Sequence, residues 1–164
     1  MYKRQDADIT RLYANDALTA SETVAVRSTL ANRNNVGITN STVTYLVWDD
    51  ANANGVFDAG DTWIDSAGNL QAYDAAAVSR TSVVSVAATS SATDSWGISN
   101  KNFPVAGLYT VSATWRASSG FLIGTNAYQF YSPGGPWPDM TLTKQLHAGQ
   151  ASRCLLYTSP SPRD

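Results

Sequence analysis

Alternation of apolar and polar residues with a period of two is the feature that most constrains this chain. The stretch ETVAVRSTL places Val24, Val26, Ser28 and Leu30 on one side and Ala25, Arg27 and Thr29 on the other. Successive side chains of a strand point to opposite faces, so this pattern buries one face of a sheet and leaves the other in water. Because it recurs between short runs of turn residues, the sequence predicts an all-β sandwich or barrel.

Further strands are predicted along the chain. They are Ala7–Ala14, Ser41–Trp48 with Val43, Tyr45 and Val47 inward, the short segment Thr62–Asp65, a β-rich stretch over residues 75–89, and Gly120–Tyr131 as a last strand or hairpin. Asn32–Asn40 is expected to be a turn, and a single helical turn near Tyr73–Ala77 stays open because alanine is a good helix former. The chain has a single glutamate, Glu22, and is rich in Thr and Val, which favours strands over helices.

The stretch FPVAGLYTVSATW is the most diagnostic of fold. Its residues Tyr109, Val111, Ala113 and Trp115 share one face of a strand. The segment Gly107–Val111 resembles the Gly-x-Tyr-x-Val entry to the penultimate strand of immunoglobulin-like domains. In those domains the tyrosine hydroxyl binds back to the preceding turn, as a tyrosine corner. The resemblance implies an antiparallel immunoglobulin-like β-sandwich of about seven to nine strands, which we assign to residues 6–131.

The two ends of the chain differ from the polypeptide between them. Residues 1–5 (MYKRQ) and 154–164 (CLLYTSPSPRD) resemble translations of a sequencing adapter, read from opposite strands. We therefore expect both to be non-native, and such segments are excluded from fold reasoning. The single cysteine, Cys154, then lies outside the native part, which offers no disulfide. Without Lys3, Arg4, Arg163 and Asp164, eleven basic and thirteen acidic residues become eight and twelve, a net charge of −4.

A Pro/Gly segment separates the expected sandwich from the rest of the chain. Residues 132–138 (SPGGPWP) are predicted to be an interdomain linker. The following DMTLTKQLHAGQ resembles the opening Asp-Leu-x-Leu-Thr-Lys of a repeat family of prokaryotic surface proteins, with Met140 in place of leucine. The resemblance implies that residues 139–153 begin a truncated next repeat domain. The alternative is that they form a C-terminal strand of the same domain.

An acidic motif interrupts the predicted strands between Trp48 and Trp63. Compared with the calcium-loop pattern D-x-[DN]-x-[DN]-G-x5-E, the chain matches at every position but the last. The predicted calcium ligands are Asp50, Asn52, Asn54, Val56 through its carbonyl, Asp58 and Asp61. Alternate oxygens of such a loop point to one centre, and the glycine, here Gly55, permits the sharp turn around the ion.

The departure is Asp61, which stands where the pattern has glutamate. Aspartate is shorter and less suited to bidentate ligation, so weak binding is expected. Strands rather than amphipathic helices flank the loop, which removes the helix-opening mechanism of calcium sensors. We therefore predict a structural Ca²⁺ site over residues 50–61, of the affinity found in extracellular modules. The alternative is a solvated Asn/Asp turn.

Other chemistries find little support in the residues. Paired carboxylates serve glycosidases, but the spacing of Asp50, Asp58 and Asp61 is better explained by the loop pattern. The only histidine, His147, lies in the expected next domain, so no Ser-His-Asp triad is available. Mild acidity argues against nucleic acid as a partner, and no apolar run is long enough to span a bilayer. The chain is not expected to be an enzyme.

Aromatic residues suggest a rival function. Trp48 and Trp63 bracket the acidic loop and Trp96 lies in a polar stretch, so an exposed coplanar row of the three could stack on sugars. Buried aromatics of a sandwich core are the alternative. The main prediction is a non-catalytic structural or adhesive module of an extracellular or surface protein, stiffened by calcium. Its partners would be neighbouring domains of the same chain, glycans or another surface protein. The rival is a carbohydrate-binding module appended to a secreted enzyme.

Overall fold

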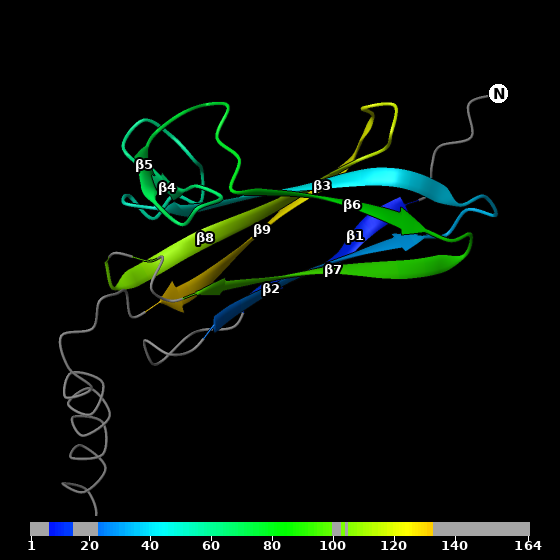
Figure 1. The fold of residues 1–164 in the computed structure, drawn as a ribbon, viewed down its shortest axis with the longest axis horizontal. Coiled ribbons are helices and arrows are strands. Elements are labelled where there is room, and N and C mark those ends of the chain that lie inside the picture. The colour runs from blue at the N-terminus through cyan, green and yellow to red at the C-terminus, as the bar shows by residue number, and fades with distance from the viewer. Residues whose placement is uncertain (1–6, 15–22, 100–102, 104, 133–164) are drawn as a thin grey trace, which may run out of the picture.

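The computed structural model describes residues 7–14, 23–99, 103 and 105–132. These residues form nine strands and no helix, so they include no helix that could cross a membrane. The strands are β1 (Ala7–Ala14), β2 (Thr23–Asn32), β3 (Ile38–Asp49), β4 (Thr62–Ile64), β5 (Leu70–Ala72), β6 (Arg80–Val86), β7 (Ser90–Ser99), β8 (Gly107–Arg116) and β9 (Leu122–Ser132) (Figure 1).

The strands pair into two antiparallel sheets. Sheet A has the order β1-β2-β7, and sheet B has the order β5-β4-β3-β8-β9. Strand β6 pairs with the first part of β3, and β4 pairs with its last two residues. The division of β1, β2 and β7 from β3, β8 and β9 matches the division of strands A, B and E from C, F and G in immunoglobulin domains. The predicted immunoglobulin-like sandwich is confirmed.

The core lies between the sheets and follows the predicted alternation. On β2, β3 and β8 the inward positions are buried: Val24, Val26, Ser28, Leu30, Val43, Tyr45, Val47, Tyr109, Val111, Ala113 and Trp115. Their apolar members belong to one contiguous cluster. Each fully buried large apolar side chain contributes about 1.5–3 kcal/mol to stability.

Tyr109 forms the predicted corner. Its hydroxyl donates to the Val105 carbonyl oxygen at 2.8 Å, four residues upstream. Its ring stacks in a buried cluster with Phe103 and Phe130, at centroid distances of 4.7 and 6.1 Å. Burial, reinforced by the charge of Asp49, raises the pKa of Tyr109 to about 12. The corner fixes the start of β8 against the end of β9.

A buried hydrogen bond joins the two sheets. Trp115 on β8 donates its Nε1–H to the hydroxyl oxygen of Ser28 on β2 at 2.7 Å. Antibody domains place a disulfide between the corresponding two strands. A buried indole N–H needs an acceptor, which explains why serine occupies an inward position of an otherwise apolar face.

Strand β7 was not predicted, because its sequence SSATDSWGIS is polar. Its inward positions include Asp94, which accepts hydrogen bonds from Tyr45 Oη at 2.8 Å and Ser82 Oγ at 3.0 Å. Arg80 Nη1 lies 3.5 Å from the same carboxylate. A largely buried carboxylate, here 12% exposed, is tolerated when it is paired and hydrogen-bonded, and those partners come from β3 and β6. Polar composition therefore did not exclude a strand.

Three smaller expectations also change. Residues Tyr73–Ala77 form a turn, with Ala77 N–H donating to the Asp74 carbonyl oxygen at 2.9 Å, and no helical turn is present there. Ile38–Asn40, expected in a turn, begin β3. Ser132, expected in the linker, ends β9 because it pairs with Gly107 and is buried. The remaining linker, the repeat segment 139–153 and both adapter-like ends lie outside the described residues.

The acidic loop lies at the pole of the sandwich where β9 ends. Ala7 at the start of β1 pairs with Asn32, close to the start of β3. Asp49 at the end of β3 pairs with Tyr109, two residues from Gly107, the partner of Ser132. The part of the chain that the structure describes thus begins at one pole, with Ala7, and ends at the other, with Ser132 (Figure 1). The acidic loop lies at the same pole as Ser132.

Candidate metal centre

The loop of residues 50–61 connects β3 to β4 and is closed by their pairing. Trp48 pairs with Trp63 and Asp49 with Thr62, so the two ends of the loop are held side by side. The strong alternation of β3 sets this position, because the strand continues to Asp49 and then stops at a run of Asn, Asp and Gly. A twelve-residue polar segment is thereby fixed at both ends by the ladder.

Asp50 organises the first half of the loop. Its side chain is only 7% exposed, and its two oxygens accept the N–H groups of Asn54 at 3.0 Å and Gly55 at 2.7 Å. The backbone curls around the carboxylate through two left-handed residues, Ala53 with φ of 56° and Gly55 with φ of 74°. Glycine adopts this conformation without steric cost, as the motif requires at its sixth position.

Asp61 closes the second half of the loop. Its side chain is 2% exposed, and it accepts the N–H of Ala51 at 3.1 Å and the N–H of Asp58 at 2.9 Å. Ala51 is the second residue of the loop and Asp58 the ninth, so one carboxylate joins the two halves of the loop. Each carboxylate oxygen has two acceptor sites, and Asp61 can therefore bind a cation while keeping both hydrogen bonds.

The remaining predicted ligands lie nearer the surface. Asn54 Nδ2 donates to Asp58 Oδ2 at 2.9 Å, and Asn52 Nδ2 donates to the same oxygen at 3.3 Å. The two amide oxygens accept backbone N–H groups two residues on, Asn52 from Asn54 at 3.0 Å and Asn54 from Val56 at 2.6 Å. Such Asx turns are typical of loop aspartates and asparagines. Val56 is exposed. The side chains of Asn52, Asn54 and Asp58 converge.

The donor set is compatible with calcium in its chemistry. All six positions offer oxygen, the ligand that calcium prefers, in about the number that it takes. The segment Trp48–Asp65 contains five aspartates and no lysine, arginine or histidine. Within the described residues, however, no group of three or more His, Cys, Asp or Glu side chains is arranged to hold a metal ion. A site here would depend on amide and carbonyl oxygens, and the ligand assignment stays a prediction.

Asp49 belongs to this acidic group, although the motif does not include it. Partial burial raises the pKa of its carboxyl, and the neighbouring charges of Asp61 and Asp50 raise it further. The loop therefore concentrates negative charge at the end of β3. The sequence indicates that Asp49 is close to Asp50, because the two residues are adjacent. Its proximity to Asp61 depends on the pairing of β3 with β4.

The loop packs on the outer face of sheet B. Trp48 points outward from β3, yet it is only 3% exposed. Phe57 of the loop lies over it with ring centroids 5.8 Å apart, and Tyr73 lies 4.8 Å from Phe57. Thus a small aromatic cluster anchors the loop outside the main core.

The three tryptophans of the rival hypothesis do not form an exposed row. Trp48 is buried beneath the loop, and Trp96 is partly buried against the core with its ring 5.7 Å from that of Tyr45. Trp63 is half-buried, and its Nε1–H donates to the Ala72 carbonyl oxygen at 3.0 Å. Phe57 of the loop covers Trp48 and Tyr45 of the opposite sheet packs on Trp96, so the three rings do not offer the flat platform that sugar stacking needs.

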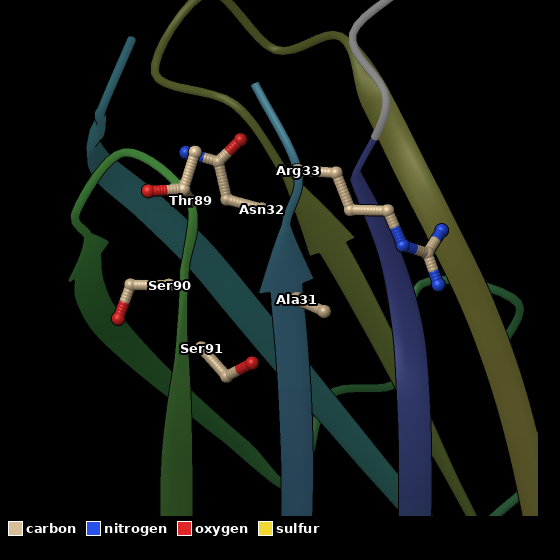
Figure 2. A pocket seen from close by; sticks show the side chains of 6 residues that line it. All are labelled: Ala31, Asn32, Arg33, Thr89, Ser90 and Ser91. Carbon is tan, nitrogen blue, oxygen red and sulfur yellow. The ribbon is translucent and has the colours of Figure 1, made fainter. Parts of the chain in front are cut away.

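A hollow at the opposite pole of the sandwich is lined by no acidic side chain. Figure 2 shows this hollow of about 560 Å³, lined by Ala31, Asn32, Arg33, Thr89, Ser90 and Ser91. Asn32 is buried, and its amide donates to the carbonyl oxygens of Val36 at 2.9 Å and Ala87 at 3.1 Å. Arg33 extends away from Thr89 (Figure 2). The polar groups here hold two turns together.

Comparisons with known proteins give structural likenesses alone. No family model matches the chain, and no curated protein matches it. The chain is similar to the CARDB domain of the PF1109 protein from Pyrococcus furiosus, solved in complex with di-metal ions, with a TM-score of 0.46 and 10% identity over 77% of this chain and 87% of that one.

Two β-glucosidases are also similar in structure. One, from Listeria innocua, has a TM-score of 0.45 and 12% identity over 83% of this chain and 16% of that one. The other, the GH3 β-glucosidase of Bifidobacterium adolescentis, has a TM-score of 0.43 and 17% identity over 84% of this chain and 19% of that one. The chain thus spans less than one fifth of either enzyme.

Proposed function

We propose that this chain is a non-catalytic structural or adhesive module of an extracellular multidomain protein, and that calcium bound by the loop of residues 50–61 stiffens it. One observation carries the proposal. The spacing of a calcium loop coincides with two carboxylates, Asp50 and Asp61, that are 7% and 2% exposed in a segment without basic side chains.

Calcium would act through electrostatics. Carboxylates removed from water are costly unless a cation or hydrogen bonds compensate them. Backbone N–H groups already compensate Asp50 and Asp61 in part, and a divalent ion would neutralise the charge that remains. A ligand that binds only the folded state stabilises it by about 1.4 kcal/mol at ten times its Kd.

The position of the loop supports a role between domains. It lies at the pole where β9 ends, within a few residues of the Gly107–Ser132 pair. An ion that orders the loop would therefore order the surface next to the exit of the strand. Partners of this kind of module would be neighbouring domains of the same chain, with glycans or another surface protein as further candidates.

The proposal is tested by thermal unfolding of the whole chain in calcium and in chelator. With calcium at about ten times the Kd expected of extracellular modules, we expect a midpoint roughly 4 °C higher than in chelator. Magnesium at the same concentration is expected to give a smaller shift, because it demands a tighter octahedral site. An unchanged midpoint at millimolar calcium would contradict the proposal.

Variants test whether the calcium-dependent shift of the midpoint arises from binding at the loop. Asp61→Asn and Asp50→Asn remove one charge each from the buried pair, and both are expected to abolish most of the calcium shift. Asp74→Asn is the matched control, since Asp74 is exposed, lies outside the loop and caps a turn by accepting the Ala76 N–H at 2.9 Å. A calcium shift that survives in Asp61→Asn would place the ion elsewhere.

A further inference from the structure

The acidic loop contains an Asn-Gly peptide bond, between Asn54 and Gly55, and both residues are exposed. In such a pair the backbone nitrogen of the glycine can attack the side-chain amide carbon of the asparagine. Water then opens the five-membered imide to aspartate or isoaspartate. Glycine hinders this attack least, because it carries no Cβ next to the nitrogen. A Cβ placed at Gly55 would have no atom within 4 Å, so the space around this bond is open.

The nitrogen of Gly55 faces a carboxylate. Its N–H donates to Asp50 Oδ2 at 2.7 Å, which is a short, charge-assisted hydrogen bond. Asp50 is held in this place by a second hydrogen bond, from the Asn54 N–H at 3.0 Å. An amide nitrogen attacks a carbonyl carbon only as its proton leaves, so a carboxylate at hydrogen-bond distance is positioned to accept that proton.

The side-chain amide of Asn54 is bound at both of its polar atoms. Its Oδ1 accepts the Val56 N–H at 2.6 Å. Attack on the amide carbon turns this oxygen into an oxyanion, and a backbone N–H directed at it stabilises such a charge. Its Nδ2 donates to Asp58 Oδ2 at 2.9 Å. The attacking nitrogen, the developing oxyanion and the leaving nitrogen thus each have a partner in the loop.

Asn52 in the same loop lacks the first of these partners. It is also exposed, and its Oδ1 also accepts a backbone N–H, from Asn54 at 3.0 Å. However, the N–H of the next residue, Ala53, donates to the backbone carbonyl oxygen of Asp50 at 3.1 Å. A peptide carbonyl oxygen accepts a hydrogen bond, but near neutral pH it does not take up a proton. The two asparagines therefore differ in the group beside the attacking nitrogen.

We propose that the loop deamidates its own residue Asn54, with Asp50 as the proton acceptor. The nitrogen of Gly55 bonds to the side-chain carbon of Asn54 and gives its proton to Asp50. The bond from that carbon to Nδ2 breaks, and water carries the proton from Asp50 to the leaving nitrogen, which departs as ammonia. A water molecule then adds across one imide bond. The net change is that asparagine and water become aspartate, or isoaspartate, and ammonia.

The product links this reaction to calcium, and only this link rests on the proposed function. The loop pattern accepts aspartate at its fifth position, which residue 54 occupies. Aspartate there adds one negative charge, and the affinity of such loops depends on the charge of their ligands. Calcium bound by Asp50 and Asn54 would occupy the oxygens that the reaction uses. The loop would therefore deamidate when calcium is scarce, and afterwards bind it more tightly.

The test follows the deamidation of the whole chain in chelator at neutral pH by peptide mass spectrometry. Replacement of NH₂ by OH raises the peptide mass, and chromatography separates isoaspartate from aspartate. We expect Asn54 to convert at least about tenfold faster in the folded chain than in the same chain unfolded in urea, where the proton acceptor is no longer held in place. An equal or slower rate in the folded chain overturns the proposal.

Asp50→Asn tests the proton acceptor at nearly constant side-chain size. We expect conversion of Asn54 to slow about a hundredfold, the lower end of the effect of a positioned acid or base. Asp74→Asn, at an exposed residue outside the loop, is the matched control and should convert as the wild type does. An unchanged or faster rate in Asp50→Asn overturns the role of Asp50. The comparison with urea needs no variant, and it remains decisive if Asp50→Asn does not fold.

Calcium binding separates this proposal from the proposed function. Calcium is expected to slow conversion of Asn54 several-fold, and Asn54→Asp is expected to bind calcium about tenfold more tightly than the wild type in a calorimetric titration. Unchanged or weaker binding by Asn54→Asp overturns the link to calcium. If the wild type shows no calcium effect, the proposed function fails while deamidation in chelator still stands. If calcium binds but Asn54 does not convert, only the present proposal fails.

Discussion

The interior of the sandwich and the acidic loop are held together by different forces. Between the sheets, apolar side chains of β2, β3 and β8 are fully buried, and the few polar groups there are paired, as Trp115 is with Ser28. In the loop, Asp50 and Asp61 are buried with backbone N–H groups as their partners. The aromatic contact of Phe57 with Trp48 is the main apolar anchor.

This difference predicts different responses to the solvent. Burial of apolar area is insensitive to cations and to pH near neutrality. A group of carboxylates without basic neighbours is sensitive to cations, because its charge is compensated only in part. The core should therefore contribute most of the stability of the domain. The loop should add a smaller part that depends on bound calcium.

The largest effect is expected from Trp115→Ala in the core. Loss of the ring leaves a cavity and removes the donor to Ser28, so the free energy of unfolding should fall by about 4 kcal/mol. Urea unfolding in calcium and in chelator measures it, and the loss should be equal in both. A loss that depends on calcium would show that core and loop are not independent.

The polar network around Asp94 should give the next largest effect. Asp94→Ala leaves Tyr45 Oη and Ser82 Oγ without their acceptor and removes the ion-pair partner of Arg80, which keeps its hydrogen bonds to the Ser95 carbonyl oxygen and Ser82 Oγ; the loss should cost about 3 kcal/mol. Asp94→Asn keeps one acceptor oxygen and should cost less. If the two variants unfold at the same urea concentration, the hydrogen bonds contribute little beyond the charge.

Alkaline pH should weaken the core specifically. Burial raises the pKa of Tyr109 to about 12 and raises the pKa of Tyr45 as well. The unfolded chain releases these protons near pH 10, and the folded chain holds them longer. Stability from Tyr109 is therefore complete below pH 10 and should fall by about 2 kcal/mol as pH rises to 12. Urea unfolding against pH measures it, and Tyr109→Phe should show a shallower decline.

Phe57→Ala should give the smallest effect and confine it to the loop. Phe57 stacks on Trp48 and Tyr73 outside the main core, so its loss should cost about 1.5 kcal/mol and reduce the calcium-dependent shift. Phe121→Ala, at a 62% exposed ring, is the control and should change stability by less than about 0.5 kcal/mol. Equal effects of the two variants would contradict an anchored loop.

Much of the fold could be predicted because strand periodicity is a local property. The inward residues of β2, β3 and β8 and the corner at Tyr109 follow from short stretches of sequence. Strand β7 could not be predicted in this way. Its Asp94 is acceptable inside only because Tyr45 and Arg80, 49 and 14 residues away, supply partners.

Some features of the candidate metal centre could likewise be predicted from the sequence, and others depend on the tertiary structure. Spacing alone identified Asp50 and Asp61 as members of one loop, and the structure shows that both are buried. The closeness of Asp49 to Asp61 and the burial of Trp48 depend on how β3 and β4 align. The choice between exposed and buried tryptophans stayed open at the level of sequence, because a sequence pattern places a residue on a face of a sheet but does not say what covers that face.

The sequence by itself determined the all-β class, the inward faces of three strands and the twelve-residue acidic loop, because each depends on residues close together in the chain. Only the tertiary structure decided that the loop folds over the outer face of sheet B, at the pole where β9 ends, and that it lies beside β9 itself. The physical reason is that strand register brings together residues such as Asn54 and Gln129, whose proximity no local pattern contains.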